Sequence, residues 1–560
     1  MSELLKRYLP RTEFDSYEDF MQNYKIDVPA DFNFGYDIVD EWARISPDKL
    51  ALRWCNDDLI LRDYTFAEAS ALSNQAANAF LKMGIRKGDI VMLILKQRPE
   101  VWWCIVGLCK IGAVCIPGTY QLKSKDIVYR SNMAGIKAIV TVPEEELLGS
   151  IRKARPDCKT LETVATLGGT PADDQLDFSK MLAEASPILS REAGAHQTRV
   201  TEPMLIYFSS GTSGMPKMVL HDHSLPLGHI VTAKYWQQVQ DDHIHLTQTD
   251  SGWAKFAWGK IYGQWICGAA IGAYDAEKFV PDLMLRAMQL IRPTTFCATL
   301  TIYRYLIKED LSGYTFDYIE HASVAGEPLN PEVFSQIEAK TGMVIREGFG
   351  QSETSVLLAN WPWIKVKPGS TGKPSPLYGI TLLNEQGRPC EDGEIGAICI
   401  TGTDQKHPTG LFKEYFLDEA VTKGCWQNGV YNTGDMAWRD SEDYYWFVGR
   451  NDDVIKCSGY RIGPFEVESA LLEHPSVLEC AVTAVADPMR GQVVKATIVL
   501  ARGFLPSDTL VKELQNHVKA VTAPYKYPRI VDFVSELPKT ISGKIRRNEI
   551  RRTDGEKNAE

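Results

Sequence analysis

Buried strands alternate with helices along much of this chain, and that alternation narrows the folds it can adopt. Residues 89–95 are apolar after the first, which is typical of a strand buried on both faces. A capping box at residues 65–68 predicts a helix over 66–83 before this strand, and a second helix is predicted near 99–110 after it. The same alternation recurs after Pro203. The predicted fold is therefore α/β, with two successive doubly wound sheet layers.

The pattern changes twice farther along the chain. Short strands with glycine-rich turns from about 369 to 448 predict a small β unit. Helices and strands of a compact α+β domain are predicted beyond 452, after a polar turn with a plausible hinge composition. A length of 560 residues fits several cores. We expect an N-terminal domain over 1–451, with subregions near 40–200, 201–368 and 369–451, and a mobile C-terminal domain over 452–560.

Charge and composition exclude some functions. The formal charge of -11 argues against a general nucleic-acid binder, because phosphate backbones are held by clustered lysines and arginines. The first ten residues lack the pattern of a secretory signal, and the most apolar stretch contains a lysine, so neither export nor a membrane span is expected. The twelve cysteines include no C-x-x-C pair, which favours reduced thiols and a cytoplasmic location.

A loop rich in glycine and hydroxyl groups follows the apolar run 204–208. Two glycines allow backbone N–H groups to turn toward an anion, while hydroxyls and a lysine add donors and charge, so residues 209–217 predict a phosphate-binding loop. The loop lacks the Walker A spacing, and Met218 stands where a magnesium-binding hydroxyl would be needed. An ordinary turn of small residues is the alternative. The candidate phosphate contacts are Ser209, Ser210, Gly211, Thr212, Ser213, Gly214 and Lys217.

Five further motifs follow this loop in order, at residues 325–329, 347–353, 431–435, 449–453 and 538–544. The set resembles the adenylate-forming superfamily of acyl-CoA synthetases, firefly-type luciferases and peptide-synthetase adenylation domains, and it spans nearly the whole chain. Residues 250–258 look most like the acetyl-CoA and medium-chain acyl-CoA synthetase branch. The resemblance implies that the chain joins a carboxylic acid to ATP, releases pyrophosphate, and passes the acyl group from AMP to coenzyme A.

The same resemblance assigns three catalytic residues. Glu353 would hold magnesium, and Ser352, where the family more often has threonine, would hydrogen-bond the α-phosphate. Lys544 would bridge the carboxylate and the α-phosphate, so that one cation contacts both reactants. A solvated lysine in a basic tail is the alternative for Lys544, because two arginines follow it.

Nucleotide and coenzyme A contacts are also implied by the resemblance. Rotation of the C-terminal domain about a hinge would exchange the catalytic lysine for the coenzyme A tunnel. A plain turn glycine at 459 and an exposed surface arginine at 461 are the alternatives there. The implied residues are Gly326, Glu327 and Pro328 at the adenine, Phe349 stacked beside it, Asp435 and Arg450 at the ribose hydroxyls, Gly459 along the coenzyme A tunnel, Arg461 as a phosphate-contacting arginine, and Asp452 at the hinge.

The residue before Gln351 bears on which acid enters. Acetate-specific relatives carry a tryptophan there, whereas this chain has Gly350, so we expect the floor of the acyl pocket to be open. Plain core packing is the alternative for the tryptophans. The resemblance and their apolar character suggest walls formed by Trp253, Ala254, Trp258 and Cys297, with Lys255 as an intruding long side chain.

We therefore expect an acyl-CoA synthetase for a short- to medium-chain acid beyond acetate, straight or branched, using ATP, magnesium and coenzyme A. An aryl acid such as benzoate is the nearest competing substrate. An adenylation enzyme loading a separate carrier protein, a luciferase-like oxygenase and a non-enzymatic nucleotide sensor are competing functions. The oligomeric state stays open, a homodimer included.

Overall fold

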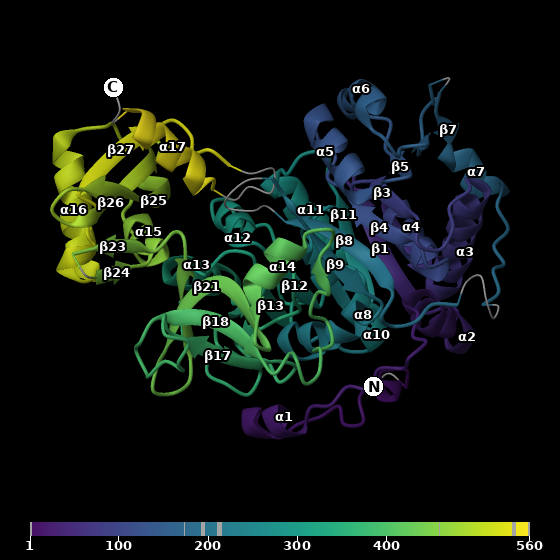
Figure 1. Cartoon of the computed structure of the whole chain (residues 1–560), viewed down its shortest axis with the longest axis horizontal. Coiled ribbons are helices and arrows are strands. Elements are labelled where there is room, and N and C mark those ends of the chain that lie inside the picture. Colours follow the sequence, from purple (N-terminus) through teal and green to yellow (C-terminus); the bar gives the residue numbers. More distant parts are fainter. Residues whose placement is uncertain are drawn as a thin grey trace.

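The computed structural model describes residues 3–172, 174–191, 197–209, 215–458, 460–539 and 545–557, with side chains described as far as Asp554. Two large β-sheets with their connecting helices lie side by side, a small β unit lies below them, and a separate α+β domain follows at the C-terminal end (Figure 1). The predicted fold class is confirmed.

The first large sheet has eight strands. Its central strands run parallel, as expected where helices form the connections, whereas β9 and β19 add to one edge in antiparallel fashion. The strand that leads into the phosphate loop, β8, belongs to this sheet, although it begins the second predicted subregion. In spatial order the strands are β19 (Glu414–Tyr415), β9 (Lys217–Asp222), β8 (Pro203–Ser209), β4 (Val114–Pro117), β3 (Ile90–Ile94), β5 (Ala138–Thr141), β6 (Thr163–Thr166) and β7 (Leu176–Asp177).

The second large sheet has nine strands and takes its far edge from the start of the chain. Strand β1 pairs in parallel with β11, and β2 pairs with β1 in antiparallel fashion. The two sheets thus exchange strands across the predicted boundary near residue 200. In spatial order the strands are β16 (Lys373–Pro374), β15 (Leu358–Ala359), β14 (Ile345–Phe349), β13 (His321–Val324), β12 (Thr295–Ala298), β10 (Ile244–Thr247), β11 (Ala270–Asp275), β1 (Leu50–Asn56) and β2 (Leu61–Thr65).

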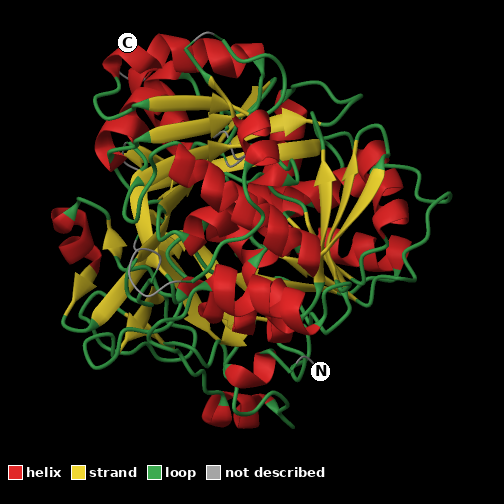
Figure 2. Cartoon of the chain, turned by 90° about the vertical axis from the view of Figure 1, so that its right-hand side faces the viewer, coloured by secondary structure: helices red, strands yellow, loops and turns green. Residues whose placement is uncertain are grey.

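Helices pack between and around the sheets (Figure 2). The predicted capping box is present, since Thr65 and Glu68 exchange hydrogen bonds at the start of α3 (Phe66–Lys82). Helix α4 (Glu100–Lys110) approaches α3 closely at Gly107, where an added Cβ would lie 2.8 Å from the Ala77 backbone nitrogen. The other main helices of the large domain are α1 (Tyr17–Asn23), α2 (Glu41–Ile45), α5 (Ser124–Ala134), α6 (Glu145–Ala154), α7 (Phe178–Glu184), α8 (Leu225–Gly228), α9 (Lys255–Gly259), α10 (Tyr262–Cys267), α11 (Pro281–Ile291), α12 (Leu300–Leu306), α13 (Pro331–Thr341) and α14 (Glu419–Cys425).

Two smaller sheets complete the chain. The β unit holds β17 (Gly379–Leu383), β18 (Gly396–Thr401), β20 (Trp426–Gln427), β21 (Val430–Arg439) and β22 (Tyr445–Arg450). The C-terminal domain combines β23 (Ile455–Cys457), β24 (Tyr460–Ile462), β25 (Val477–Asp487), β26 (Gly491–Leu500) and β27 (Ile530–Val534) with α15 (Pro464–Leu472), α16 (Asp508–Val521) and α17 (Arg547–Lys557). The mixture of helices and strands predicted beyond residue 452 is present.

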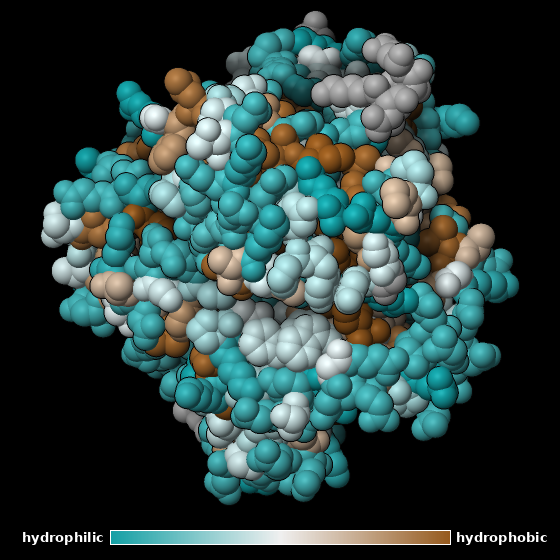
Figure 3. Space-filling model, turned by 90° about the vertical axis from the view of Figure 1, so that its left-hand side faces the viewer, coloured by the Kyte–Doolittle hydropathy of each residue, from teal (hydrophilic) through white to brown (hydrophobic). Residues whose placement is uncertain are grey.

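The surface on the side of the C-terminal domain is largely hydrophilic, with hydrophobic side chains scattered among polar ones (Figure 3). Within the described part of the chain, no helix combines the length and the apolar character needed to cross a membrane.

Candidate active site

Asp435 and Arg450, which the sequence places in separate motifs, lie directly opposite each other. They are paired residues of the antiparallel strands β21 and β22, so their side chains emerge on the same face. Arg450 Nη1 lies 3.5 Å from Asp435 Oδ1. The carboxylate is buried, while the Arg450 side chain stays 38% exposed. The pair therefore offers an acceptor and a donor at one point of the surface, as binding a ribose diol requires.

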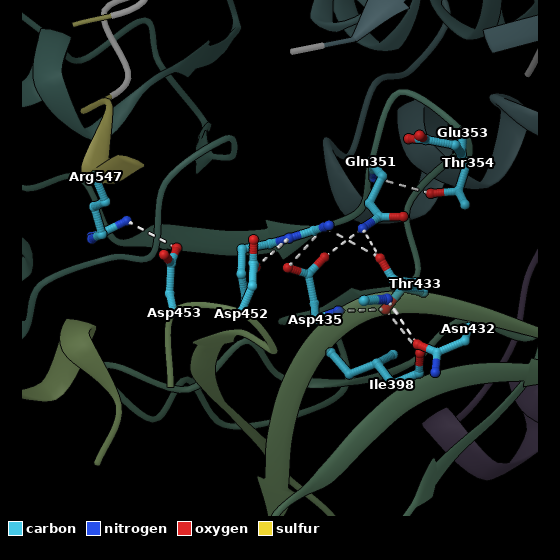
Figure 4. A network of polar contacts seen from close by, with 12 residues as sticks. Gln351, Glu353, Thr354, Ile398, Asn432, Thr433, Asp435, Asp452, Asp453 and Arg547 are labelled. Carbon is cyan, nitrogen blue, oxygen red and sulfur yellow. Dashed lines mark hydrogen bonds and ion pairs between the residues drawn. The ribbon is translucent and has the colours of Figure 1, made fainter. Parts of the chain in front are cut away.

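Gln351 joins this pair to the end of β14 (Figure 4). Its Nε2 donates to the Thr433 carbonyl at 2.9 Å and also to the Asp435 carboxylate, and its Oε1 accepts from the Tyr431 hydroxyl at 3.2 Å. These bonds fix the loop that carries Ser352 and Glu353 against strand β21. We assigned Gln351 no role from the sequence, although it lies inside a recognised motif.

The predicted magnesium ligand Glu353 and the phosphate-loop lysine meet at one tyrosine. Tyr415 donates its hydroxyl proton to Glu353 Oε1 at 2.8 Å, and Lys217 Nζ lies 4.7 Å from the centre of the same ring. The glutamate and the tyrosine are both buried. Burial and the Glu353 carboxylate raise the pKa of Tyr415 above its ordinary value, so the phenol stays protonated as a donor.

Tyr415 was missed in the sequence because its strand, β19, has only two residues. It reaches the site because β19 pairs with β9, placing Tyr415 opposite Val219, two residues beyond Lys217. The sequence held only a weak signal for Tyr415. Two aromatic residues, Phe412 and Tyr415, lie close together in the sequence, shortly before the motif at residues 431–435.

His221 holds the backbone of Ser352. Its Nε2 lies 2.7 Å from the Ser352 carbonyl oxygen and donates to it, which leaves Nδ1 without a proton. Burial lowers the pKa of His221 to about 4, so the ring is neutral near pH 7. Lys217 and His221 lie four residues apart on β9 and therefore on one face of the strand. His221 was also missed in the sequence.

The predicted adenine residues follow β13, the strand beside β14. Val324 pairs with Glu347, so both strands end at one edge, where Gly326 adopts a positive φ of 101°. Glu327 accepts hydrogen bonds from the Thr301 backbone nitrogen and hydroxyl at 3.2 and 3.0 Å. Phe349 ends β14 and packs against Phe447.

A buried acid ties this loop to the neighbouring strand. Glu347 Oε2 accepts from the Leu329 backbone nitrogen at 2.9 Å. Burial raises the pKa of Glu347 to about 8, so the carboxyl is largely protonated at neutral pH. A neutral acid here costs less than a buried, unpaired charge. Pro328 lies in the same loop and is half-buried.

The predicted acyl-wall residues differ in burial. Trp258 and Cys297 are buried in the hydrophobic core of the large domain and Ala254 packs against that core, whereas Trp253 is half-buried and is not part of it. Lys255 does not project freely into a pocket, because its Nζ donates to the Ala325 carbonyl at 2.9 Å.

The expectation of an open floor beside Gly350 was wrong. A Cβ added to Gly350 would lie 2.6 Å from Trp258 Cζ2 and 2.7 Å from the Ser355 carbonyl oxygen. The space vacated at residue 350 is therefore filled by an indole that comes from helix α9. The physical reason is a long-range contact, which the residue type at 350 alone does not reveal.

Charged contacts surround the predicted hinge (Figure 4). Arg547 Nη1 lies 3.8 Å from Asp453 Oδ2. The Asp452 carbonyl accepts from Arg551 Nη1 at 3.2 Å, and the buried carboxylate of Asp453 lies 2.8 Å from the same nitrogen. Arg547 donates to both carboxylate oxygens of buried Glu468, at 2.7 and 2.8 Å. The start of α17 is thereby held against the residues that leave the large domain.

Arg461 pairs with a residue of the β unit. Its guanidinium forms an ion pair with Glu385, and Lys456 Nζ lies 3.7 Å from the same carboxylate. The predicted phosphate-contacting arginine is therefore engaged with the large domain in this arrangement. The predictions for Ser210, Gly211, Thr212, Ser213, Gly214, Gly459 and Lys544 fall outside the described residues.

Known families and proteins match most of the chain. Residues 39–416 match the family described as AMP-binding enzyme, and residues 466–544 match the AMP-binding enzyme C-terminal domain. The chain is 39% identical to the mitochondrial acyl-coenzyme A synthetase ACSM3 of Mus musculus, covering 99% of this chain and 96% of that protein. It is 41% identical to the mitochondrial acyl-coenzyme A synthetase ACSM4 of Rattus norvegicus, covering 94% of this chain and 91% of that one.

A solved structure shares the arrangement. The crystal structure of the anthranilate CoA ligase AuaEII with anthranoyl-AMP superposes with a TM-score of 0.87 at 27% identity, covering 95% of this chain and 99% of that one.

Proposed function

This chain belongs to the AMP-binding enzyme family and is an AMP-forming acyl-CoA synthetase, and on that premise we propose which residues divide the work and which acids it activates. The observation that carries the proposal is the convergence of four separate motifs on one place. Asp435, Arg450 and Gln351 form one polar network, and the next residues of the same loop lead to Glu353 and, through Tyr415, to Lys217.

Adenylation depends on positioning and on charge, since a weak carboxylate nucleophile attacks the α-phosphate. Asp435 would accept from a ribose hydroxyl and Arg450 would donate to the same diol. Neutral His221 holds the backbone of Ser352, which lets the Ser352 hydroxyl face the α-phosphate with little reorganisation. Lys217 would hold the phosphates that leave as pyrophosphate. Lys544 would neutralise charge between the acid and the α-phosphate.

The buried carboxylate of Glu353 fits a magnesium ion, because Mg²⁺ prefers oxygen ligands and usually binds through one or two carboxylates together with substrate phosphates. Glu353 would be the protein ligand, and bound magnesium would neutralise charge on the phosphate oxygens. The Tyr415 hydroxyl donates a hydrogen bond to one oxygen of this carboxylate and so orients the Glu353 side chain.

We propose a short- to medium-chain acid, straight or branched, as the substrate. Support comes from the apolar Trp258 ring beside Gly350 and from the two acyl-coenzyme A synthetases at about 40% identity. An aryl acid is the second candidate, because the anthranilate CoA ligase shares the fold over nearly the full length. The cytoplasmic location stays a prediction, while both relatives carry the word mitochondrial in their names.

A panel of linear, branched and aromatic acids, assayed for AMP formation with and without coenzyme A, tests the proposal. We expect AMP formation that depends on both an acid and coenzyme A, with straight or branched aliphatic acids preferred. Acid-dependent pyrophosphate exchange without transfer to coenzyme A would instead favour a carrier protein as the acceptor. A preference for benzoate-type acids would replace the aliphatic proposal.

A further inference from the structure

Two buried carboxylates meet two arginines of helix α17 in the C-terminal domain. Asp453 directly follows the predicted hinge residue, and Glu468 lies on α15. Arg551 forms an ion pair with Asp453 at 2.8 Å, and Arg547 reaches both acids, Glu468 at 2.7 Å and Asp453 at 3.8 Å (Figure 4). Each buried negative charge is thus matched by a positive one, without which its burial would be costly. We call these four side chains the ionic cluster.

The ionic cluster joins three separate parts of the domain. Glu468 Oε1 also accepts a hydrogen bond from the Val482 backbone nitrogen at 2.8 Å, which ties the carboxylate to β25. Arg551 Nη1 also donates to the Asp452 carbonyl at the hinge, at 3.2 Å. Helix α17 is therefore held at once to the hinge, to α15 and to β25.

Helix α17 begins just after the segment that carries the catalytic lysine. That segment, residues 540–544, lies outside the described residues, but both of its ends are described. Lys539 and Ile545 pair as an antiparallel bridge, and Lys539 Nζ lies 2.8 Å from Glu479 Oε1 of β25. Arg547 follows this bridge by two residues. The ionic cluster therefore anchors the C-terminal end of the lysine segment.

The neighbouring Arg546 makes a different kind of contact. Its side chain is 55% exposed, and its Nη1 lies 2.8 Å from Glu549 Oε2, three residues along the chain. An exposed pair between such close neighbours contributes little to stability. The two arginines that follow Lys544 thus differ, because Arg547 links distant elements whereas the Arg546 pair is local.

Resting on the proposed function, we propose that Arg547 is a positioning residue for Lys544, and that the ionic cluster makes the hinge and the lysine segment move as one rigid body. One cation must contact both the acid and the α-phosphate, and a misplacement of about 1 Å at such a site costs about a hundredfold in rate. A rotation at the hinge places Lys544 reproducibly only if the connection between them is stiff. Thioester formation uses the Gly459 face instead, so it does not depend on this connection.

Arg547→Met tests the proposal, with Arg546→Met as the matched control. Acid-dependent pyrophosphate exchange measures adenylation, and thioester formation from supplied acyl-adenylate measures the second step alone. We expect Arg547→Met to lower kcat for exchange about 10- to 100-fold, with KM for ATP and the thioester step within about threefold of wild type. Arg546→Met should stay within about twofold of wild type in both steps.

Two milder variants separate positioning from folding. Arg547→Lys keeps the charge but loses the planar fork, so it should recover part of the exchange rate. Glu468→Gln keeps an acceptor for the Val482 N–H and should lower exchange in the same direction. In the double variant with Arg547→Met, the loss should be smaller than the product of the two single losses, because both changes break one interaction.

Equal losses of both steps in Arg547→Met would overturn the proposal, since the arginine would then act through the stability of the whole domain. Wild-type exchange in a folded Arg547→Met enzyme, or an equal loss of exchange in Arg546→Met, would also overturn it. If Arg547→Met fails to fold, Arg547→Lys and Glu468→Gln carry the test, and an unchanged ratio of the two steps in both would refute the assignment. Failure of the proposed function looks different, because the wild type would then support no exchange with any acid.

Discussion

Replacing Tyr415 with phenylalanine removes one hydroxyl from the proposed magnesium site and leaves the ring in place. The hydroxyl donates to Glu353 Oε1 at 2.8 Å, and both side chains are buried. The ring that faces Lys217 Nζ at 4.7 Å is retained. The change therefore tests the hydrogen bond separately from the cation–π contact.

The expected magnitude follows from the kind of bond that is lost. A hydrogen bond to a charged group contributes about 1.5–3 kcal/mol. If the bond orients Glu353 for the magnesium–ATP complex, losing it lowers kcat/KM for ATP by about 10- to 150-fold. Because the carboxylate itself remains, added magnesium should recover part of the loss.

The assay is acid-dependent pyrophosphate exchange measured over a magnesium series. Tyr444→Phe is the matched control, since its hydroxyl donates to the Lys365 carbonyl at 2.7 Å, outside the proposed site. Tyr444→Phe should lower the melting temperature without changing kcat/KM. If kcat/KM for ATP of Tyr415→Phe stays within about twofold of the wild-type value, or if the control loses as much activity, Tyr415 does not orient Glu353 as proposed.

The remaining predictions concern the division of labour and the buried acid. Lys544→Ala should abolish acyl-adenylate formation yet still convert supplied acyl-adenylate to thioester, whereas Gly459→Leu should do the reverse; equal loss of both steps in either variant would refute the two-orientation mechanism. Glu347 has a pKa raised to about 8 in the folded chain, so between about pH 4.5 and 8 the folded state binds a proton that the unfolded state has lost, and the free energy of unfolding falls as the pH rises through this window. Glu347→Gln keeps an acceptor for the Leu329 N–H but does not titrate. The melting temperature of this variant minus that of the wild type should therefore increase progressively from about pH 5 to pH 8, and a pH-independent difference would contradict this.

Local patterns in the sequence predicted most elements of the fold but not the partners of every strand. The capping box at Thr65 and the buried strand β3 depend on neighbouring residues, and both are present. The placement of β1 in the second sheet and of β8 in the first depends on pairings between distant segments. Hydrophobic pattern identifies a strand but does not say which strand lies beside it.

The functional site likewise contains residues that sequence motifs reveal and residues that only contacts between distant segments reveal. Asp435 and Arg450 could be named because each lies in a motif that resembles one of the adenylate-forming superfamily, and the structure pairs them. Tyr415 and His221 enter through the pairing of β19 with β9 and through a contact with a backbone carbonyl, neither of which leaves a motif in the sequence. The Trp258 ring reached Gly350 by the same kind of long-range contact, and it reversed the expectation of an open floor.

The central claim is that the acid's carboxylate attacks the α-phosphate of ATP at the site built around Asp435, Arg450 and Glu353. An acid labelled with ¹⁸O in its carboxylate tests this most directly, with the products of a turnover in ATP, magnesium and coenzyme A analysed by mass spectrometry. The mechanism places one labelled oxygen in AMP, because the bridging oxygen of the acyl-adenylate leaves with AMP when the thiol attacks the carbonyl. Label in inorganic phosphate with unlabelled nucleotide would mean attack at the γ-phosphate and would contradict the mechanism.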